Sequence, residues 1–145
     1  AIDLVTRKLP QSGGEHVSGY IGELRAIADE IAKRNSPEFG ATAARLDDAL
    51  NDLEAATGWL LQALQDGRIK EALAGATPYQ RLFGLASGTS YLAKGALVET
   101  GDARDSGRVA LCRFCAENLL GETAGLKDAV MQGAESLDQA RSALA

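Results

Sequence analysis

The stretch from Pro37 to Gln65, PEFGATAARLDDALNDLEAATGWLLQALQ, predicts the fold more directly than any other part of this 145-residue chain. Its apolar residues, with one threonine among them, return every three or four positions, which is the spacing of one helix face. That face consists of Phe39, Ala43, Leu46, Leu50, Leu53, Thr57, Leu60 and Leu64. A helix of this length extends roughly 40 Å, which suits a helical bundle better than a compact mixed fold.

The sequence before this stretch predicts a first helix from Glu15 to Arg34. Ser12 and Glu15 have the spacing of a capping box at its start. One stripe of this helix is apolar and consists of Val17, Ile21, Leu24, Ala28 and Ile31. Pro37 follows a serine and is expected to end the first helix and begin the second, and Gly67 follows Asp66 as the expected stop of the second.

The sequence after Gly67 predicts a short segment from Ile69 to Leu73 and then two more long helices. Thr77 is expected to cap the third helix, with Pro78 in the first helical position and Gln80 returning a hydrogen bond. The apolar positions of the third helix are Leu82, Leu85, Thr89, Leu92, Ala93 and Ala96, and it is expected to reach about Glu99, with Thr100, Gly101 and Asp102 as its end.

The fourth long helix is expected to begin between Arg104 and Arg108 and to run through Val130. Gly133 should interrupt it, and residues 134–144 form a short terminal helix. No segment alternates apolar and polar residues as a half-buried strand does. We therefore expect an all-α fold, an up-and-down four-helix bundle with short extra terminal helices.

The composition excludes several classes of protein. The chain has 20 acidic and 15 basic residues, a net charge of −5, and no basic block of the kind that binds nucleic acid. Its longest apolar runs, such as Trp59 to Leu61, fall far below the roughly 18 residues of a membrane span. Two cysteines and no signal segment favour a cytoplasmic location.

Cys112 and Cys115 form a C-x-x-C pair that could serve as a redox couple or as half of a zinc site. Zinc needs four ligands, and His16 lies on a different expected helix. A redox pair usually owes its reactive thiolate to a helix N-terminus, whereas these cysteines lie inside a helix. The interpretation we prefer is that they are small core residues and that His16 lies on the surface.

The carboxylates Asp47, Asp48, Asp52 and Glu54 cluster on the second helix. Paired carboxylates can act as acid and base or as metal ligands, but a di-metal bundle also uses histidines from two helices and the chain has one histidine. We interpret the cluster as a solvated helix face.

Three glycines, Gly84, Gly88 and Gly95, lie inside the third helix, where each costs about 1 kcal/mol relative to alanine. Close packing of a neighbouring helix is the preferred explanation, and close approach of a ligand is the alternative. Tyr79, Phe83 and Tyr91 of the same helix are expected in the core or at an interface.

The segment from Ala72 to Gly84, ALAGATPYQRLFG, resembles part of the C-terminal helical domain of certain flavin-dependent acyl-CoA dehydrogenases. Ala1 to Leu9 resembles the stretch that joins the flavin-binding bundle of such an enzyme to this domain. The likeness continues in residues that match its last helix, namely Arg113, Phe114, Ala116, Glu117, Leu119, Leu120, Val130, Gly133 and Ala134. Cys115, Asn118 and Gly121 replace the aromatic residue, histidine and proline common in that helix.

The resemblance implies an FAD-dependent α,β-desaturation of an acyl-CoA thioester, a step of fatty acid metabolism, in the full-length enzyme. In the family the catalytic carboxylate belongs to a Glu-Gly-Thr segment that precedes the stretch matching Ala1 to Leu9. This sequence has no Glu-Gly-Thr, and Gly121 to Thr123 carries a different order. We therefore expect no catalytic, cofactor-binding or metal-binding residue in this chain and assign FAD to the full-length enzyme.

The same resemblance implies a division into a linker from the dehydrogenase domain, residues 1–12, and a helical bundle domain, residues 13–145. An opening without an initiator methionine fits a cut at that junction. The expected partners are the dehydrogenase core of the same polypeptide, acyl-CoA in the full-length enzyme, and further copies of the chain in a homo-oligomer. The alternatives are a standalone interaction module that dimerises through Ala-rich and Gly-rich faces and a thiol redox helper that uses Cys112 and Cys115.

Overall fold

The computed structural model describes residues 1–98 and 104–144 and is all-α over those residues, as the sequence predicts. It contains seven α-helices there and no β-strand. The helices are α1 (Glu15–Arg34), α2 (Thr42–Gln65), α3 (Ile69–Ala74), α4 (Ala76–Ala96), α5 (Arg104–Asn118), α6 (Thr123–Met131) and α7 (Glu135–Leu144). No helix within these two ranges is both long enough and apolar enough to cross a membrane.

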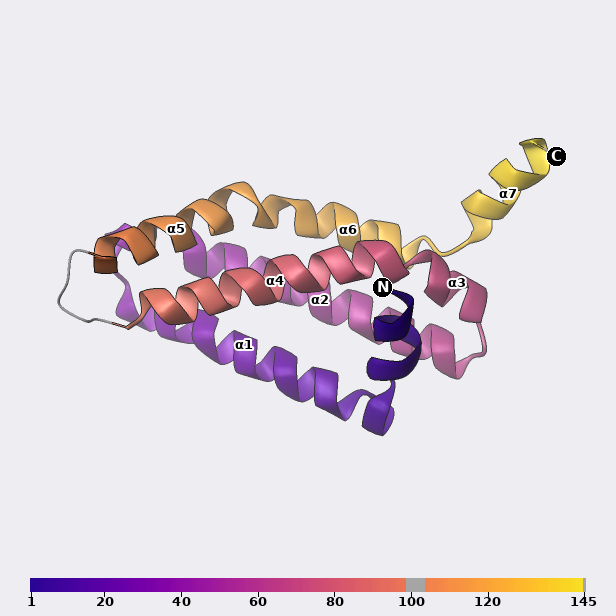
Figure 1. Cartoon of the computed structure of the whole chain (residues 1–145), viewed down its shortest axis with the longest axis horizontal. Coiled ribbons are helices and arrows are strands. Elements are labelled where there is room, and N and C mark those ends of the chain that lie inside the picture. The colour runs from indigo at the N-terminus through magenta and orange to yellow at the C-terminus, as the bar shows by residue number, and fades with distance from the viewer. Residues whose placement is uncertain (99–103, 145) are drawn as a thin grey trace.

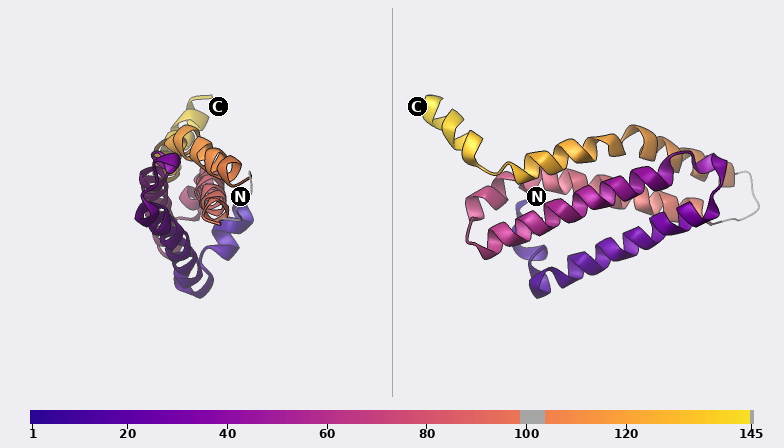
Figure 2. Two further views of the ribbon diagram at one scale, coloured as in Figure 1. Left: turned by 90° about the vertical axis from the view of Figure 1, so that its left-hand side faces the viewer. Right: turned by 180° about the vertical axis from the view of Figure 1, so that it is seen from behind.

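The long helices lie lengthwise against one another (Figure 1). Helix α4 packs between α1 and the successive helices α5 and α6, and α2 packs behind α4 against all of them (Figures 1 and 2). Helix α7 projects away from this group in every view. The face of α4 that points away from α2 is therefore on the outside of the molecule.

The predicted helix faces form the core. The five apolar residues named for α1 are all buried, and Leu46, Leu50, Leu53 and Leu60 of α2 are fully enclosed. Helix α4 contributes Tyr79, the largest fully buried side chain among residues 1–98 and 104–144. A helix that buries one stripe and exposes the other is stabilised mainly by this packing rather than by helix propensity.

The N-terminal segment also contributes to the core. It begins with a single π-helical turn, Leu4–Lys8, which packs near α3 and α4. Val5 and Leu9 are buried there. The assignment of residues 1–12 to a linker stays a prediction, and these two side chains show that the segment is anchored to the helices.

The second helix begins later than predicted. Pro37–Phe39 forms a short 3₁₀ turn, and α2 starts only at Thr42. Gly40 separates the two because its φ of 51° is left-handed and not helical. A side chain has no room at this position, since a Cβ there would collide with the Glu117 carboxylate. The same carboxylate accepts a hydrogen bond from the Ala41 amide, 3.1 Å between N and Oε1. The contact from α5 therefore stabilises the boundary that the left-handed backbone of Gly40 makes.

The end of α2 is as predicted. Gly67 has a φ of 73°, its amide bonds to the Leu64 carbonyl at 3.2 Å, and the Arg68 amide bonds to the Ala63 carbonyl at 2.8 Å. These two bonds make a Schellman motif, which satisfies carbonyls at the end of the helix.

The two predicted side-chain caps are wrong. Ser12 has a φ of 51° and its hydroxyl lies 3.3 Å from Nε2 of His16, so it forms no capping box. Helix α4 begins at Ala76, so Thr77 is already helical. The helical backbone of Gly75 joins α3 directly to α4, which leaves no chain end for Thr77 to cap.

The fourth predicted helix is two helices. A 3₁₀ turn, Leu120–Glu122, separates α5 from α6, and Leu120 turns into the core there. The Thr123 hydroxyl oxygen lies 2.9 Å from the Leu120 carbonyl oxygen. Gly133, with a φ of 68°, follows α6 and precedes α7, as predicted. Helix α4 ends at Ala96, earlier than the expected Glu99, and residues 99–103 with the predicted stop lie outside the described residues.

Candidate functional site

The acidic residues of α2 form ion pairs with two neighbouring helices, α1 and α6. Arg25 of α1 reaches across to Asp47 (2.8 Å), Asn51 (3.0 Å) and Glu54 (2.9 Å). Asp47 and Glu54 remain exposed, so their interpretation as a solvated face is correct. What the sequence did not show is that one arginine joins them across the α1–α2 contact.

Asp52 departs from the solvated-face interpretation because its side chain is only 14% exposed. Its two oxygens accept hydrogen bonds from the Thr123 hydroxyl at 2.8 Å and from the Lys127 ammonium at 2.9 Å. The hydrogen bond from Lys127 and the charge of Asp52 raise the pKa of the lysine. Asp52 therefore joins α2 to α6 through these two hydrogen bonds and stabilises the contact between the helices.

These pairs account for most of the cluster without a metal. Within residues 1–98 and 104–144, no group of three or more histidine, cysteine or carboxylate side chains is placed to hold a metal ion. His16 is exposed, as the sequence predicts, and lies at the start of α1.

The two cysteines differ in burial. Cys112 is fully enclosed, as expected for a core residue, and burial raises the pKa of its thiol to about 11. Cys115 is partly exposed. Because the thiolate is the reactive form, the raised pKa of Cys112 is the opposite of what a redox pair needs at neutral pH.

A buried pair of hydroxyls lies at the centre of the bundle. The Thr57 hydroxyl donates to the Leu53 carbonyl at 2.7 Å and lies 2.8 Å from the Tyr79 hydroxyl. Since the single proton of Thr57 is used by Leu53, Tyr79 donates to Thr57. Burial raises the pKa of Tyr79 to about 12. The pair joins α2 to α4 and holds no free acid or base.

The expectation that Gly84 and Gly88 pack against a neighbouring helix is wrong. Both glycines are exposed on the outer side of α4, and a Cβ built on either would have no heavy atom within 4 Å. Gly75 is the glycine of this region that makes a close approach, since a Cβ there would lie 3.1 Å from the Val130 carbonyl oxygen of α6.

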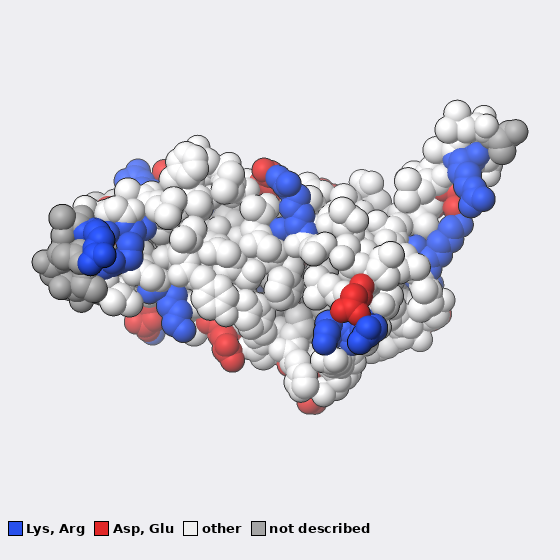
Figure 3. Space-filling view, viewed as in Figure 1, with Lys and Arg blue, Asp and Glu red and all other residues white. Residues whose placement is uncertain are grey.

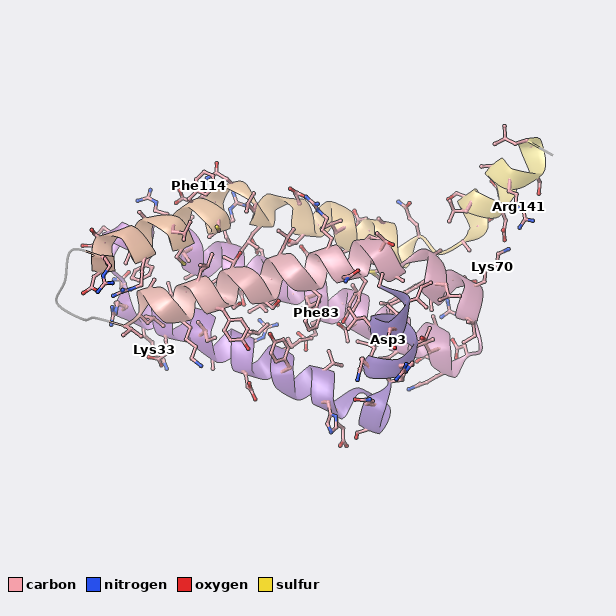
Figure 4. The ribbon with its side chains drawn as sticks, viewed as in Figure 1. Asp3, Lys33, Lys70, Phe83, Phe114 and Arg141 are labelled. Carbon is pink, nitrogen blue, oxygen red and sulfur yellow. The ribbon has the colours of Figure 1, made fainter. Side chains whose placement is uncertain are left out.

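Aromatic residues of α4 are shared between the core and the surface. Phe83 stacks on Tyr20 of α1, with ring centroids 5.6 Å apart, and lies where these two helices meet (Figure 4). Tyr91 is 52% exposed. The expectation of core or interface positions thus holds for Tyr79 and Phe83, and Tyr91 is half exposed beside Tyr20 at the edge of the contact between α1 and α4.

Two hollows lie side by side where α1 ends and α5 begins. Their volumes are about 350 and 480 Å³, and Ser36 and Phe39 line both. Arg34, Glu38 and Asp105 place both signs of charge around the second hollow. A lining of mixed charge shows no preference for an anionic or a cationic ligand.

One further ion pair joins α4 to the turn before α6. Arg81 donates from Nε at 3.0 Å and from Nη2 at 2.7 Å to one oxygen of Glu122. Like the pairs of Arg25 and Lys127, it joins residues far apart in the sequence. Pattern analysis missed all three because periodicity shows which residues share a face but not which faces meet.

Comparison with known proteins agrees with the helical architecture. The family described as "Acetyl-CoA dehydrogenase C-terminal like" matches residues 20–140, from α1 into α7. No curated protein and no solved structure matches the chain. Because the family match covers most of the chain, this protein belongs to the acetyl-CoA dehydrogenase C-terminal-like family.

Proposed function

We propose that this chain is the C-terminal helical bundle of an FAD-dependent acyl-CoA dehydrogenase and that it serves assembly rather than catalysis. Residues 1–12 are the linker from the dehydrogenase domain, and residues 13–145 form an up-and-down four-helix bundle whose fourth member is α5 followed by α6. The observation that carries the proposal is the family match over residues 20–140.

The use of the polar residues supports a structural role. Arg25, Asp52 and Arg81 each form ion pairs between elements of the bundle. The buried hydroxyls of Thr57 and Tyr79 bond to each other. Groups that are already paired in this way stabilise one packing arrangement of the helices and are not available to activate a substrate.

We infer that FAD is held by another part of the proposed enzyme and not by this chain. A flavin site needs polar groups directed at the ring and at the phosphates, and the enclosed hydroxyls of Thr57, Ser90 and Thr123 all donate within the bundle. We therefore assign FAD and the α,β-desaturation of acyl-CoA to the dehydrogenase core of the proposed full-length enzyme, and no catalytic step to this chain.

The position of the N-terminal segment suggests how the core would be held. Val5 and Leu9 are buried against the bundle, and the N-terminus lies on the side of the molecule where α4 is exposed (Figure 1). We infer that a linker anchored in this way directs the chain that precedes it to this side of the bundle.

Isolation of the native protein with an antibody against this chain tests the proposal. We expect a yellow species several-fold heavier than 15.1 kDa that oxidises acyl-CoA with an artificial electron acceptor. The purified 145-residue chain should show no turnover in the same assay. A colourless native species near 15.1 kDa, or turnover by the chain alone, would contradict the proposal.

A further inference from the structure

The projecting helix α7 has one apolar side, and that side is in water. Leu137, Ala140 and Leu144 follow one another at helical spacing, and all three are exposed. Leu137 is 59% exposed and Leu144 is 90% exposed. No side chain within Glu135–Leu144 is buried, so α7 contributes no residue to the core.

The side of α7 that faces the bundle is polar. The Lys70 ammonium of α3 donates to the Asp138 carboxylate and joins the two helices. Between them lies a hollow of about 490 Å³, to which α7 contributes Glu135, Asp138 and Gln139. Figure 4 shows Lys70 and Arg141 along one side of α7, and in Figure 3 the charged groups of the projecting helix gather on that side. The two leucines therefore point away from α3 and into solvent.

A short helix with an uncovered apolar stripe indicates a contact with another molecule. Helix α7 has 10 residues, and isolated helices shorter than about 12–15 residues are marginal in water. An amphipathic helix is normally stabilised by covering its apolar side. Gly133, with a φ of 68°, turns α7 out of line with α6, so the rest of the described chain does not cover the leucines.

The apolar side of α7 is complementary to itself. Asp138 and Arg141, three residues apart, flank the stripe on the same side. An antiparallel twofold contact brings this flank of one copy against the same flank of the other. With the axis between positions 139 and 140, each Arg141 lies opposite the Asp138 of the second copy, because both are equally far from the axis. The same axis places Leu137 of one copy between Ala140 and Leu144 of the other.

We propose that the leucine side of α7 binds the same side of α7 in a second copy of this chain. Charge complementarity identifies the occupant, because Arg141 meets a carboxylate only in this antiparallel arrangement. Lys70 occupies Oδ1 of Asp138, and the carboxylate has a second oxygen for the arginine. Two leucines from each copy make a small contact, so the dimer is weak and concentration-dependent. The inference goes beyond the proposed function and does not depend on the dehydrogenase core.

Disulfide trapping tests the geometry and detects a weak dimer. The variants are made with Cys115→Ser, which removes the partly exposed thiol and leaves the buried Cys112. Ala140 lies beside the proposed axis, so Ala140→Cys should form a covalent dimer with copper phenanthroline, as non-reducing electrophoresis would show. Gln139→Cys is the matched control because Gln139 is also exposed but lies on the opposite side of α7. It should react at least ~10-fold more slowly, and equal rates or no cross-link at position 140 would overturn the proposal.

Sedimentation equilibrium of the 145-residue chain tests the charge pairing. The average mass of the wild type should rise from 15.1 kDa toward twice that value as the concentration increases. Arg141→Glu should raise the dissociation constant at least ~10-fold, because it places like charges opposite each other across the contact. A wild-type chain that stays monomeric at every concentration would also overturn the proposal.

Ser142→Glu is the matched control for this charge change. Ser142 is exposed in the same last turn of α7 but lies on the side away from the leucines. Both variants add negative charge near the C-terminal end of the helix, so a difference between them reports the contact rather than the stability of α7. The dissociation constant of Ser142→Glu should equal that of the wild type, and equal weakening by both variants would refute the pairing.

Discussion

Replacement of Tyr79 by phenylalanine isolates one buried hydrogen bond in the centre of the bundle. The Tyr79 hydroxyl donates to Thr57 at 2.8 Å, and its side chain is fully buried. Loss of a neutral hydrogen bond of this kind costs about 1 kcal/mol. At pH 8 we therefore expect Tyr79→Phe to lower the free energy of unfolding by about that amount.

The difference in the free energy of unfolding between Tyr79→Phe and the wild type should shrink, and then change sign, as the pH rises. Burial raises the pKa of Tyr79 from 10.0 to about 12, so the folded state holds the proton more tightly than the unfolded chain. The contribution of the protonated Tyr79 to the free energy of unfolding is fully present below pH 10 and is lost as the pH rises toward 12. Because the pKa of Tyr79 differs between the unfolded chain and the folded protein, ionisation of this residue lowers the free energy of unfolding of the wild type by about 1.4 kcal/mol at pH 11. Tyr79→Phe has no such group and does not lose this contribution.

Urea unfolding followed by circular dichroism at pH 8, 9, 10 and 11 measures both effects. The deficit of Tyr79→Phe should shrink from about 1 kcal/mol to zero or reverse sign over this range. Tyr91→Phe, which changes a half-exposed ring, should stay within about 0.5 kcal/mol of the wild type at pH 8. A deficit that stays constant from pH 8 to pH 11 would refute the reasoning.

Three further predictions concern the helix contacts. Gly75→Ala should destabilise the protein by about 1–3 kcal/mol because the new methyl group would press on the α6 backbone, whereas Gly22→Ala should stabilise it by up to about 1 kcal/mol; thermal unfolding distinguishes the two. Arg25→Ala should cost about 1 kcal/mol in dilute buffer and less in 1 M salt, since its partners are exposed carboxylates. Iodoacetamide at pH 8 should label Cys115 in the folded protein and label Cys112 only after unfolding, as mass spectrometry would show.

The long helices were predictable because the signal for each of them is local. Helix α1 begins and ends at the predicted residues, Glu15 and Arg34, and its apolar stripe is the buried one. The stop at Gly67 was predictable for the same reason, since a left-handed glycine after a helix satisfies carbonyls within the preceding turn. The C-terminal α7 also follows the predicted interruption at Gly133.

The errors occur where a distant residue decides the local structure. Gly40 breaks the predicted second helix with a φ of 51°, and Glu117 of α5 stabilises the break by accepting a hydrogen bond from the Ala41 amide. Leu120 breaks the fourth because it turns into a core that other helices supply. Leu120 gives no signal of this turn within its own segment, whereas Gly40 is a residue that favours a break and that the apolar periodicity outweighed.

The side of α4 that carries Gly84 and Gly88 shows the same difference between what is local and what depends on packing. The sequence by itself determined that Gly84 and Gly88 share one side of a helix, because a spacing of four residues is one helical turn. It could not determine whether that side meets another helix, and only the packing of α4 between α1 and α5 shows that it faces outward. Periodicity is a property of one segment, whereas burial and ion pairing depend on the surfaces that other segments bring to it. The tertiary structure therefore decided which glycines pack, which carboxylates are paired and which face is left open.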